Sequence, residues 1–300
     1  MNSDTCSVVV CTRNRLPHLK ACLSSLAAQT FSKHEIIVVN DGSTDGTREF
    51  LDSLNQETIT VVHNNQTAGK SAARNKGIQH AHAGIIAFID DDCTADPRWL
   101  AELLAGFTSE RCGMVIGQTF YISKTYHGYF PERLVANPNA HWPMTCNIAY
   151  QKTVFQTCGG FNTVFDAYNN EDSEMAIRTR AAGFSFNRAP DAIVFHQPAV
   201  WTQKSLLASA KNASVWPVLK KKYPNHYACF GPPIMWGTVV NATDYLYLLA
   251  SPILIPLLLA RYLAHGKRNV KIFFTKWPLL LLLRRYYVYR EALARRILML

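Results

Sequence analysis

Residues 85–92 have the sequence IIAFIDDD, in which a short apolar run ends at three consecutive aspartates. The apolar run predicts a strand that is buried within a sheet. Three adjacent carboxylates repel one another and cannot be buried unpaired, so we expect them at the exposed end of that strand. Divalent cations bind carboxylate oxygens readily. The segment therefore predicts either a cation site or an acidic turn that caps the next helix.

Apolar runs that end in polar residues recur along the first half of the chain and alternate with segments of helical spacing. This alternation predicts an α/β fold, a mostly parallel sheet with helices on both faces. Ligands of such sheets bind at the carboxyl ends of the strands, so we expect Thr12, Arg15, Asp41 and residues 90–92 to line one edge. The expected strands cover residues 7–11, 35–39, 58–62, 85–89 and 113–117, and the expected helices cover residues 16–26, 44–54, 70–82 and 99–107.

The second half of the chain has a less regular pattern. Residues 121–142 are rich in tyrosine, histidine and proline, which predicts an irregular loop that faces a ligand. A helix is expected to begin near Asp172, and a short strand over residues 192–195 is expected to end at His196. Asp172 and His196 therefore also stand at element ends, where they can face the same crevice as the aspartates.

Composition places the chain among ordered globular proteins, because 48% of its 300 residues are hydrophobic and no region is of low complexity. Its eight cysteines include no Cys-x-x-Cys pair, which indicates buried reduced thiols, a cytosolic compartment and no paired zinc motif. Residues 1–5 are polar, so a secretory signal is not expected there.

The net charge of +10 is concentrated at the end of the chain. Residues 261–300 hold ten of the 31 lysines and arginines and one of the 21 acidic residues, which leaves a net charge of +1 for residues 1–260. A nearly neutral body argues against nucleic-acid binding. The basic tail instead indicates an anionic partner such as a membrane surface.

The tail, residues 231–300, combines this charge with apolar segments. The apolar run over residues 245–260 is a little shorter than the about 20 residues of a membrane-spanning helix, and Pro252 and Pro256 are expected to kink it. The last residues predict a helix with one apolar face, which is typical of helices that lie in a membrane surface. That face is formed by Tyr286, Tyr289, Leu293, Ile297 and Leu300.

We therefore predict that the tail associates with the cytoplasmic side of a membrane as a re-entrant or interfacial structure. Two alternatives stay open. The tail can contain one true membrane span, or it can be a helical extension that packs on the rest of the chain or in a dimer.

Taken together, six segments resemble family 2 glycosyltransferases of the GT-A fold, in the order in which that family carries them. They extend over roughly residues 7–200, and their combination is specific although each segment alone is not. The segments are residues 9–15 (VVCTRNR), 36–47 (IIVVNDGSTDGT), 69–77 (GKSAARNKG), 88–92 (FIDDD), 146–162 with its N-x-A and GGF elements, and 170–178 (NEDSEMAIR).

The resemblance implies an enzyme that transfers a sugar, with inversion, from a nucleotide diphosphate sugar to an acceptor hydroxyl, with Mg²⁺ or Mn²⁺ as cofactor. A UDP-sugar donor is favoured, and the acceptor is expected to be a saccharide or a lipid-linked molecule. By resemblance, Asp172 is the catalytic base, and Asp92 and His196 are metal ligands. The residues that the resemblance assigns to donor binding are Thr12, Arg15, Asp41, Arg74, Asp90, Asp91 and Glu171.

The resemblance also implies a division of tasks along the chain. Residues 1–117 are expected to bind the nucleotide-sugar, residues 118–230 to bind the acceptor and hold the base, and residues 231–300 to form the membrane-associated tail. Residues 143–147 are expected to face the acceptor. Many processive relatives carry a Gln-x-x-Arg-Trp element, whereas residues 201–205 are WTQKS, so addition of a single sugar is expected.

Other interpretations stay open at this point. Asp41 fits an ordinary turn, Asp172 fits a helix cap, and His196 fits a satisfied surface or core histidine. A nucleotidyltransferase also uses an α/β sheet, a metal and acids, but residues 12–17 lack the glycine-rich phosphate loop expected there. A non-catalytic membrane scaffold is the third interpretation.

Overall fold

The computed structural model describes residues 5–122, 132–133, 135–200, 202–230, 234–235, 239–240 and 242–299. The chain forms two compact units. The first comprises residues 1–124, 134–166 and 171–198, and the second comprises residues 125–133, 167–170 and 199–300. The loop expected over residues 121–142 lies partly outside the described residues. The expected division into three parts at residues 117 and 230 stays a prediction.

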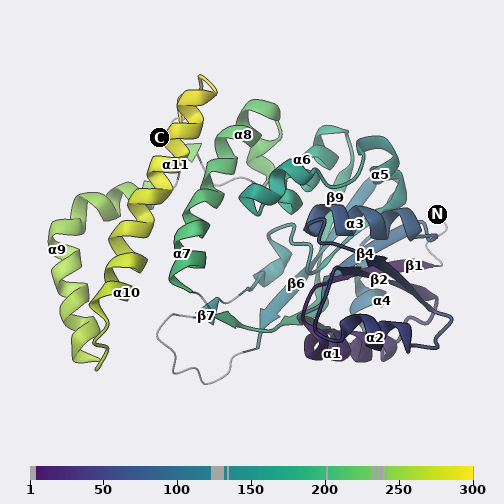
Figure 1. The fold of residues 1–300 in the computed structure, drawn as a ribbon. Coiled ribbons are helices and arrows are strands. Elements are labelled where there is room, and N and C mark those ends of the chain that lie inside the picture. The colour runs from purple at the N-terminus through teal and green to yellow at the C-terminus, as the bar shows by residue number, and fades with distance from the viewer. Residues whose placement is uncertain are drawn as a thin grey trace. The chain divides into compact units, whose positions relative to one another are not determined.

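The first unit contains a mixed sheet of eight strands in the order β3-β2-β1-β4-β8-β6-β9-β5 (Figure 1). The strands are β1 (Cys6–Thr12), β2 (His34–Asp41), β3 (Ile59–Asn64), β4 (Ile85–Asp90), β5 (Cys93–Ala95), β6 (Cys112–Tyr121), β8 (Ile148–Gln151) and β9 (Ser185–His196). β1 to β4 pair in parallel, as do β6 and β9, whereas β8 and β5 pair antiparallel with their neighbours. The expected α/β class is confirmed, with four of the seven neighbouring pairs in the described sheet parallel.

Helices cover both faces of this sheet. They are α1 (Leu16–Ala27), α2 (Thr47–Asp52), α3 (Lys70–His80), α4 (Trp99–Ala105), α5 (Lys152–Cys158) and α6 (Glu171–Ala181), with short 3₁₀ turns η1 (Pro138–Ala140) and η2 (Thr163–Tyr168). Alternation along β1 separates the two layers, because Val8 packs in one cluster with Leu19 of α1 and Trp99 of α4. Val9 faces α3 on the other side, where a Cβ added to Gly77 would lie 2.4 Å from it. Each such buried aliphatic side chain stabilises the fold by about 1.5–3 kcal/mol.

Several elements differ in length from the expectation, among them β6, which is longer than the strand expected over residues 113–117. The helix expected over residues 44–54 is shortened to α2, because Asp45 accepts hydrogen bonds from Thr47 and from the backbone of Leu16 and so holds the preceding residues in a turn. The strand expected over residues 192–195 is the end of the longer β9. The first part of β9 carries exposed polar residues and has no apolar pattern that would predict a strand. It is a strand because it pairs with β6.

The second unit is mainly helical in its described residues. α11 packs against η3 and α8, and it buries Arg285, Val288 and Ala292. The helices are α7 (Gln203–Ser209), α8 (Val215–Lys222), α9 (Ala242–Ala264), α10 (Val270–Phe274) and α11 (Leu280–Ala294), with short turns η3 (Ala210–Ser214), η4 (Tyr227–Cys229) and η5 (Thr275–Leu279). Two short strand pairs join β7 (Glu132–Arg133) to β10 (Ala199–Val200) and β11 (Ile234–Met235) to β12 (Val239–Val240).

The prediction of one apolar helical face over residues 286–300 is wrong in its extent. Tyr286 and Leu293 are exposed on α11, at 55% and 77%, as that prediction requires. The helix ends before Ile297, because Arg296 adopts a left-handed backbone conformation with φ of 55°. Leu300 lies outside the described residues. The apolar face is therefore shorter than the spacing suggests.

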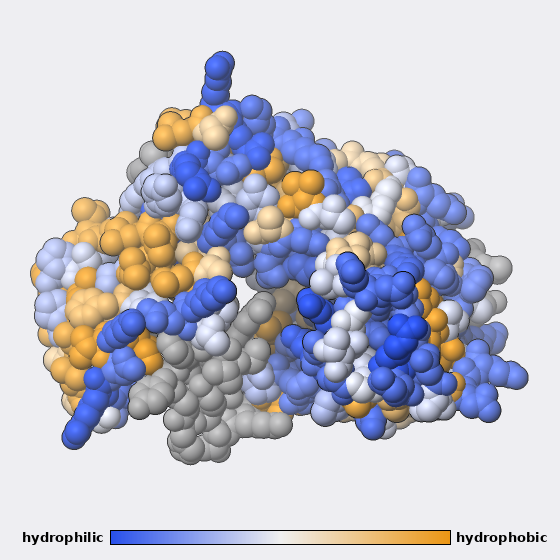
Figure 2. Space-filling model, in the orientation of Figure 1, coloured by the Kyte–Doolittle hydropathy of each residue, from blue (hydrophilic) through white to orange (hydrophobic). Residues whose placement is uncertain are grey.

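α9 exposes an apolar surface along its length. Leu249 and Ile253 are exposed at 81% and 70%, and Figure 2 shows a hydrophobic surface around this helix. By length and composition alone, Tyr245–Ala264 could cross a membrane, and none of this segment is buried inside the structure. The helix continues past residue 260 and is not interrupted at Pro252 or Pro256, so it is longer than the apolar run that predicts it.

Candidate active site

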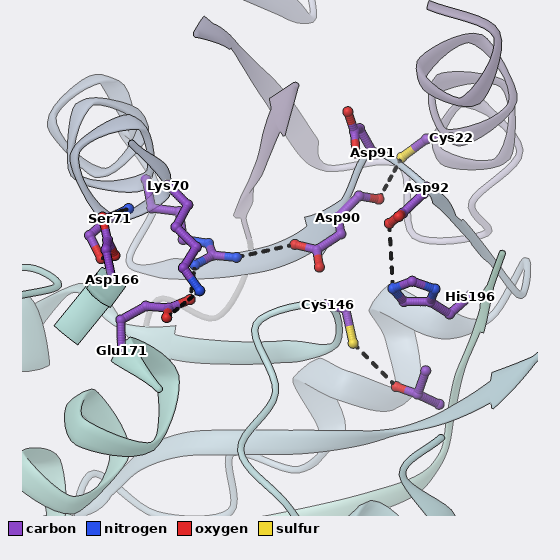
Figure 3. Close-up of polar contacts among 12 residues, drawn as sticks. Cys22, Lys70, Ser71, Asp90, Asp91, Asp92, Cys146, Asp166, Glu171 and His196 are labelled. Carbon is purple, nitrogen blue, oxygen red and sulfur yellow. Dashed lines mark hydrogen bonds and ion pairs between the residues drawn. The ribbon is translucent and has the colours of Figure 1, made fainter. Parts of the chain in front are cut away.

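The carboxyl ends of β1 to β4 meet at one edge of the sheet. Parallel pairing places Thr12 beside Asn40 and Cys11 beside Asp90. The chain leaves β1 toward β2 and β3 and returns on the other side as β4, and ligands of open α/β sheets bind at such a switch point. The predicted edge is therefore present. Figure 3 shows part of this edge, where Asp90 and Glu171 are labelled. Both carboxylates pair with the guanidinium of Arg74.

Asp41, at the end of β2, organises the loop that follows β3. Its carboxylate accepts hydrogen bonds from the side chains of Asn64 and Thr67, both at 2.8 Å, and from the backbone amides of Ala68 and Gly69, at 2.8 and 3.1 Å. Burial pushes the pKa of Asp41 upward, but these four hydrogen bonds outweigh it and hold the pKa below its ordinary value. The ionised carboxylate thus shapes the loop beside the switch point.

Asp91 supports the same edge from inside the protein. It is only 3% exposed, accepts a hydrogen bond from Thr12 Oγ1 at 2.7 Å and pairs with Arg15 at 2.9 Å. Burial raises the pKa of Asp91 to about 6, although Arg15 acts in the opposite direction. Arg15 also reaches Asp92 at 2.7 Å while its side chain stays 47% exposed. Arg15 therefore holds two carboxylates and remains accessible to a ligand.

A ring nitrogen of His196 faces a buried oxygen of Asp92. The Nδ1 atom of His196 lies 2.7 Å from the carbonyl oxygen of Gln197, and a carbonyl only accepts, so Nδ1 carries the proton. Nε2 of the same ring faces Asp92 Oδ1 at 3.4 Å, as Figure 3 shows. That oxygen is buried and has no hydrogen-bond partner among the described residues. A buried carboxylate oxygen without a hydrogen bond is unfavourable unless a proton or a metal ion lies beside it.

These two side chains therefore fit a divalent metal ion. A carboxylate oxygen and an imidazole nitrogen are common ligands of such ions, and a ligating histidine usually donates its other ring N–H to a carbonyl, as His196 does to Gln197. The antiparallel pairing of β5 with β9 holds His196 beside the residues that follow β4. A proton shared by Asp92 and His196 is the alternative occupant.

Glu171 is locked by two cations from α3. Arg74 lies 2.6 Å from one oxygen of Glu171 and 3.3 Å from Asp90, and Lys70 lies 2.5 Å from the other oxygen of Glu171. Glu171 is 2% exposed, and a buried carboxylate that lost its partners would destabilise the fold by about 3–5 kcal/mol. These four charged side chains thus tie the start of α6 to α3 and to the end of β4.

Asp172, next to this cluster, differs from Glu171. It lies in the first turn of α6 and accepts a hydrogen bond from the amide of Ser173 at 2.7 Å. Burial, followed by the charge of Glu171, raises the pKa of Asp172 to about 7, although Lys70 and Arg74 act in the opposite direction. No ion pair to Asp172 occurs among the described residues. Such a carboxylate is suited to accept a proton near neutral pH.

The expectation that residues 143–147 face an acceptor is wrong for Asn147. This side chain is buried, donates to the carbonyls of Gln118 and Ala192 at 2.8 and 2.9 Å, and accepts from the indole of Trp99 at 2.8 Å. The register of β6 and β9 shifts beside Gln118, and Asn147 satisfies carbonyls that this irregularity leaves without ladder partners. It thereby holds the last part of β9, which carries the predicted histidine ligand.

Two further contacts, which no sequence pattern predicts, tie α3 to the segment before α6. Asp166 accepts hydrogen bonds from the amide and the hydroxyl of Ser71, in the first turn of α3. Asn75 donates to the carbonyl of Phe161 at 2.8 Å and accepts from its amide at 2.7 Å. Their only mark in the sequence is that Ser71 and Asn75 lie in one of the six segments of the resemblance.

The sheet order, the polar edge and the acidic residues at the ends of its strands define a GT-A-type α/β protein. Residues 7–174 match the family described as glycosyl transferase family 2. The chain belongs to this family.

Two relatives show the range of the likeness. Glycosyltransferase AglE of Haloferax volcanii is 27% identical over 205 residues, which are 63% of this chain and 66% of that protein. The protein of Escherichia coli named UDP-Glc:alpha-D-GlcNAc-diphosphoundecaprenol beta-1,3-glucosyltransferase WfaP is 25% identical over 182 residues, 59% of this chain and 70% of that protein. The match thus spans about two thirds of the length of each relative.

A solved structure shares the fold. Mannosyltransferase PcManGT from Pyrobaculum calidifontis, in complex with GDP-Man and Mn²⁺, matches with a TM-score of 0.65 over 95% of this chain and 86% of that chain. The two sequences are 16% identical, so the likeness shows the fold alone.

Proposed function

We propose that this protein is a metal-dependent glycosyltransferase that moves one sugar, with inversion, from a nucleotide diphosphate sugar to an acceptor hydroxyl. The observation that carries the proposal is the buried Oδ1 of Asp92, which has no hydrogen bond among the described residues and faces Nε2 of His196, together with the raised pKa of Asp172. The first feature suits a bound cation and the second suits a general base.

Asp172 is the proposed base. Inversion needs one group that takes the proton of the acceptor hydroxyl as it attacks the sugar, and such help is worth about 10²–10⁴-fold in rate. Glu171 is unsuited to this task because Lys70 and Arg74 pair with both of its oxygens. The same pairs hold the first turn of α6, and with it Asp172, in place.

The donor is proposed to bind at the switch point of the sheet. Asp92 and His196 would hold Mg²⁺ or Mn²⁺, which when bound supplies a Lewis acid for the departing nucleotide diphosphate. The accessible guanidinium of Arg15 can donate hydrogen bonds to a phosphate oxygen. The other proposed donor contacts are Thr12, Asp41, Arg74, Asp90, Asp91 and Glu171.

The comparisons support the classes of donor and acceptor. The Pyrobaculum structure contains GDP-Man and Mn²⁺, and the Escherichia relative is named for UDP-Glc and a GlcNAc-diphosphoundecaprenol. We therefore infer a nucleotide-sugar donor, with UDP-sugars favoured, and a saccharide or lipid-linked acceptor. The exposed apolar helix α9 and the basic tail support association with the cytoplasmic side of a membrane. The missing Gln-x-x-Arg-Trp element supports a non-processive reaction.

The Asp172→Asn variant tests the proposed base. We expect D172N to bind nucleotide-sugar as the wild type does and to lose about 10²-fold or more in turnover, because only proton acceptance is removed. Binding is measured by calorimetry and turnover by sugar transfer. Asp191→Asn, the same change at an exposed aspartate of β9, is the matched control and should keep full turnover.

Near-normal turnover in D172N would refute the assignment of the base. The donor class is tested separately by thermal stabilisation with a panel of UDP- and GDP-sugars, with and without Mn²⁺. Release of pyrophosphate would favour a nucleotidyltransferase instead, and no stabilisation by any nucleotide-sugar would favour a scaffold.

A further inference from the structure

Cys93 places a thiol next to the facing side chains of Asp92 and His196. β5 and β9 pair so that Cys93 lies opposite His196. One ligand atom from each of Asp92, Cys93 and His196 lies within 4.8 Å of the other two. Cys93 is 1% exposed and the His196 side chain is 8% exposed, so the sulfur is enclosed with these ligand atoms and with the thiol of Cys146, its hydrogen-bond partner, rather than with solvent. Burial and Cys146 raise the pKa of Cys93 above its ordinary value, so the thiol loses its proton only when a metal ion takes its place.

We propose that Asp92, Cys93 and His196 form a binding site for a thiophilic divalent cation such as Zn²⁺ or Cd²⁺. Thiolate and imidazole bind these ions far better than Mg²⁺, which prefers oxygen ligands. Three protein ligands with a fourth position open are sufficient for a tetrahedral ion. The ligands come from the start of β5 and the end of β9, which pair in the sheet but lie far apart along the sequence, and this is why no paired zinc motif is visible there.

Binding exchanges one proton for the cation. The S–H bond of Cys93 breaks, a sulfur–metal bond forms and the proton passes to the buffer. His196 would bind the ion through Nε2 while its Nδ1–H keeps the hydrogen bond to Gln197. Asp92 Oδ1 takes part in this site and in the proposed Mg²⁺ or Mn²⁺ site, so the two kinds of ion exclude each other. The proposal depends on this geometry and not on the transfer reaction.

The test is a titration of the full chain with Cd²⁺, followed by the thiolate-to-Cd²⁺ charge-transfer absorbance. Cys229 is the exposed thiol, so the starting protein carries Cys229→Ser to remove its signal. We expect a saturable band, and in Cys93→Ser we expect its loss together with at least about tenfold weaker Cd²⁺ binding. Cys22→Ser changes another fully buried cysteine, outside the three ligands, and should keep the band and the affinity.

A second variant separates loss of a ligand from loss of folding. His196→Gln keeps the thiol and removes the nitrogen, so Cd²⁺ should bind about tenfold or more weakly with the band retained at saturation. Circular dichroism checks the fold of each variant before titration. Unchanged Cd²⁺ affinity in C93S, or in H196Q where C93S does not fold, would overturn the proposal. Absence of a band in the starting protein would overturn it as well.

Discussion

Asp92 is a single residue with two different environments on its two oxygens. Oδ2 pairs with the accessible Arg15, whereas Oδ1 is buried opposite Nε2 of His196. A metal ion bound to Oδ1 would give that buried oxygen a partner. The ion pair between Oδ2 and Arg15 would still balance the charge of the carboxylate. The same carboxylate can therefore link a cation to the basic side chain at the edge of the site.

We expect Asp92→Ala to lose the Mn²⁺-dependent part of nucleotide-sugar affinity, by about 10–100-fold, because the oxygen that faces His196 is removed. Calorimetry with and without Mn²⁺ measures this part directly. Asp191→Ala, at an exposed position of β9, is the control and should keep the metal effect. An unchanged Mn²⁺-dependent affinity in D92A would show that the metal binds elsewhere.

The pKa of the single residue Asp172 predicts how kcat/KM depends on pH. A base acts only when ionised, and burial raises the pKa of Asp172 to about 7. The value of kcat/KM should therefore fall about tenfold per pH unit as the pH drops below that pKa, and level off above it. The residual activity of D172N should lack this acid limb. A profile that stays flat down to about pH 5 would contradict the assignment.

At the scale of elements, α3 connects the donor edge to the proposed base. One rigid helix carries all of the side chains that make this connection, so the start of α6 is positioned by several contacts rather than by one. These side chains are Lys70 and Arg74, which pair with Glu171, Ser71, which bonds Asp166, and Asn75, which bonds Phe161.

β9 is positioned by a different device, the buried amide of Asn147. Asn147→Ala would leave the carbonyls of Gln118 and Ala192 and the indole of Trp99 without partners, so we expect about 2–4 kcal/mol lower unfolding free energy and weaker Mn²⁺ binding. Asn187→Ala, which removes two partly exposed hydrogen bonds of the same strand, should cost about 1 kcal/mol or less. Urea denaturation distinguishes the two. Equal stability of the variants would show that the network is not needed.

At the scale of the whole molecule, the exposed apolar surface of α9 sets the proposed location. We expect the full chain to float with vesicles of anionic lipid, and Ile253→Asp to weaken this binding by about 100-fold, since an aspartate at the centre of such a helix costs about 2.5–3.5 kcal/mol. Val164→Asp introduces the same charge at a position of the first unit that is 65% exposed, and it should float like the wild type. Flotation of I253D equal to that of the wild type would show that α9 is not the anchor.

The local hydrophobic pattern of the sequence predicts the α/β class and most of the residues at the edge of the sheet where the candidate site lies. Strand segments such as residues 85–89 are recognisable because burial on both faces leaves a continuous apolar run, and the polar residue that follows must lie where the strand ends. Thr12, Asp41 and Asp90 lie at one edge for this reason alone. The same pattern does not predict the antiparallel pairing of β8 or the first part of β9, because both are determined by strands that lie far away along the chain.

By itself, then, the sequence determined the family, the order of strands and helices in the first half, and which acids end the strands. Only the tertiary structure decided what those acids touch. Arg74 and Glu171 are 97 residues apart, and His196 reaches Asp92 only because β9 pairs with β5. Periodicity describes where a side chain leaves the backbone, whereas a charge, a tautomer or a buried amide is defined by the partner that packing brings to it.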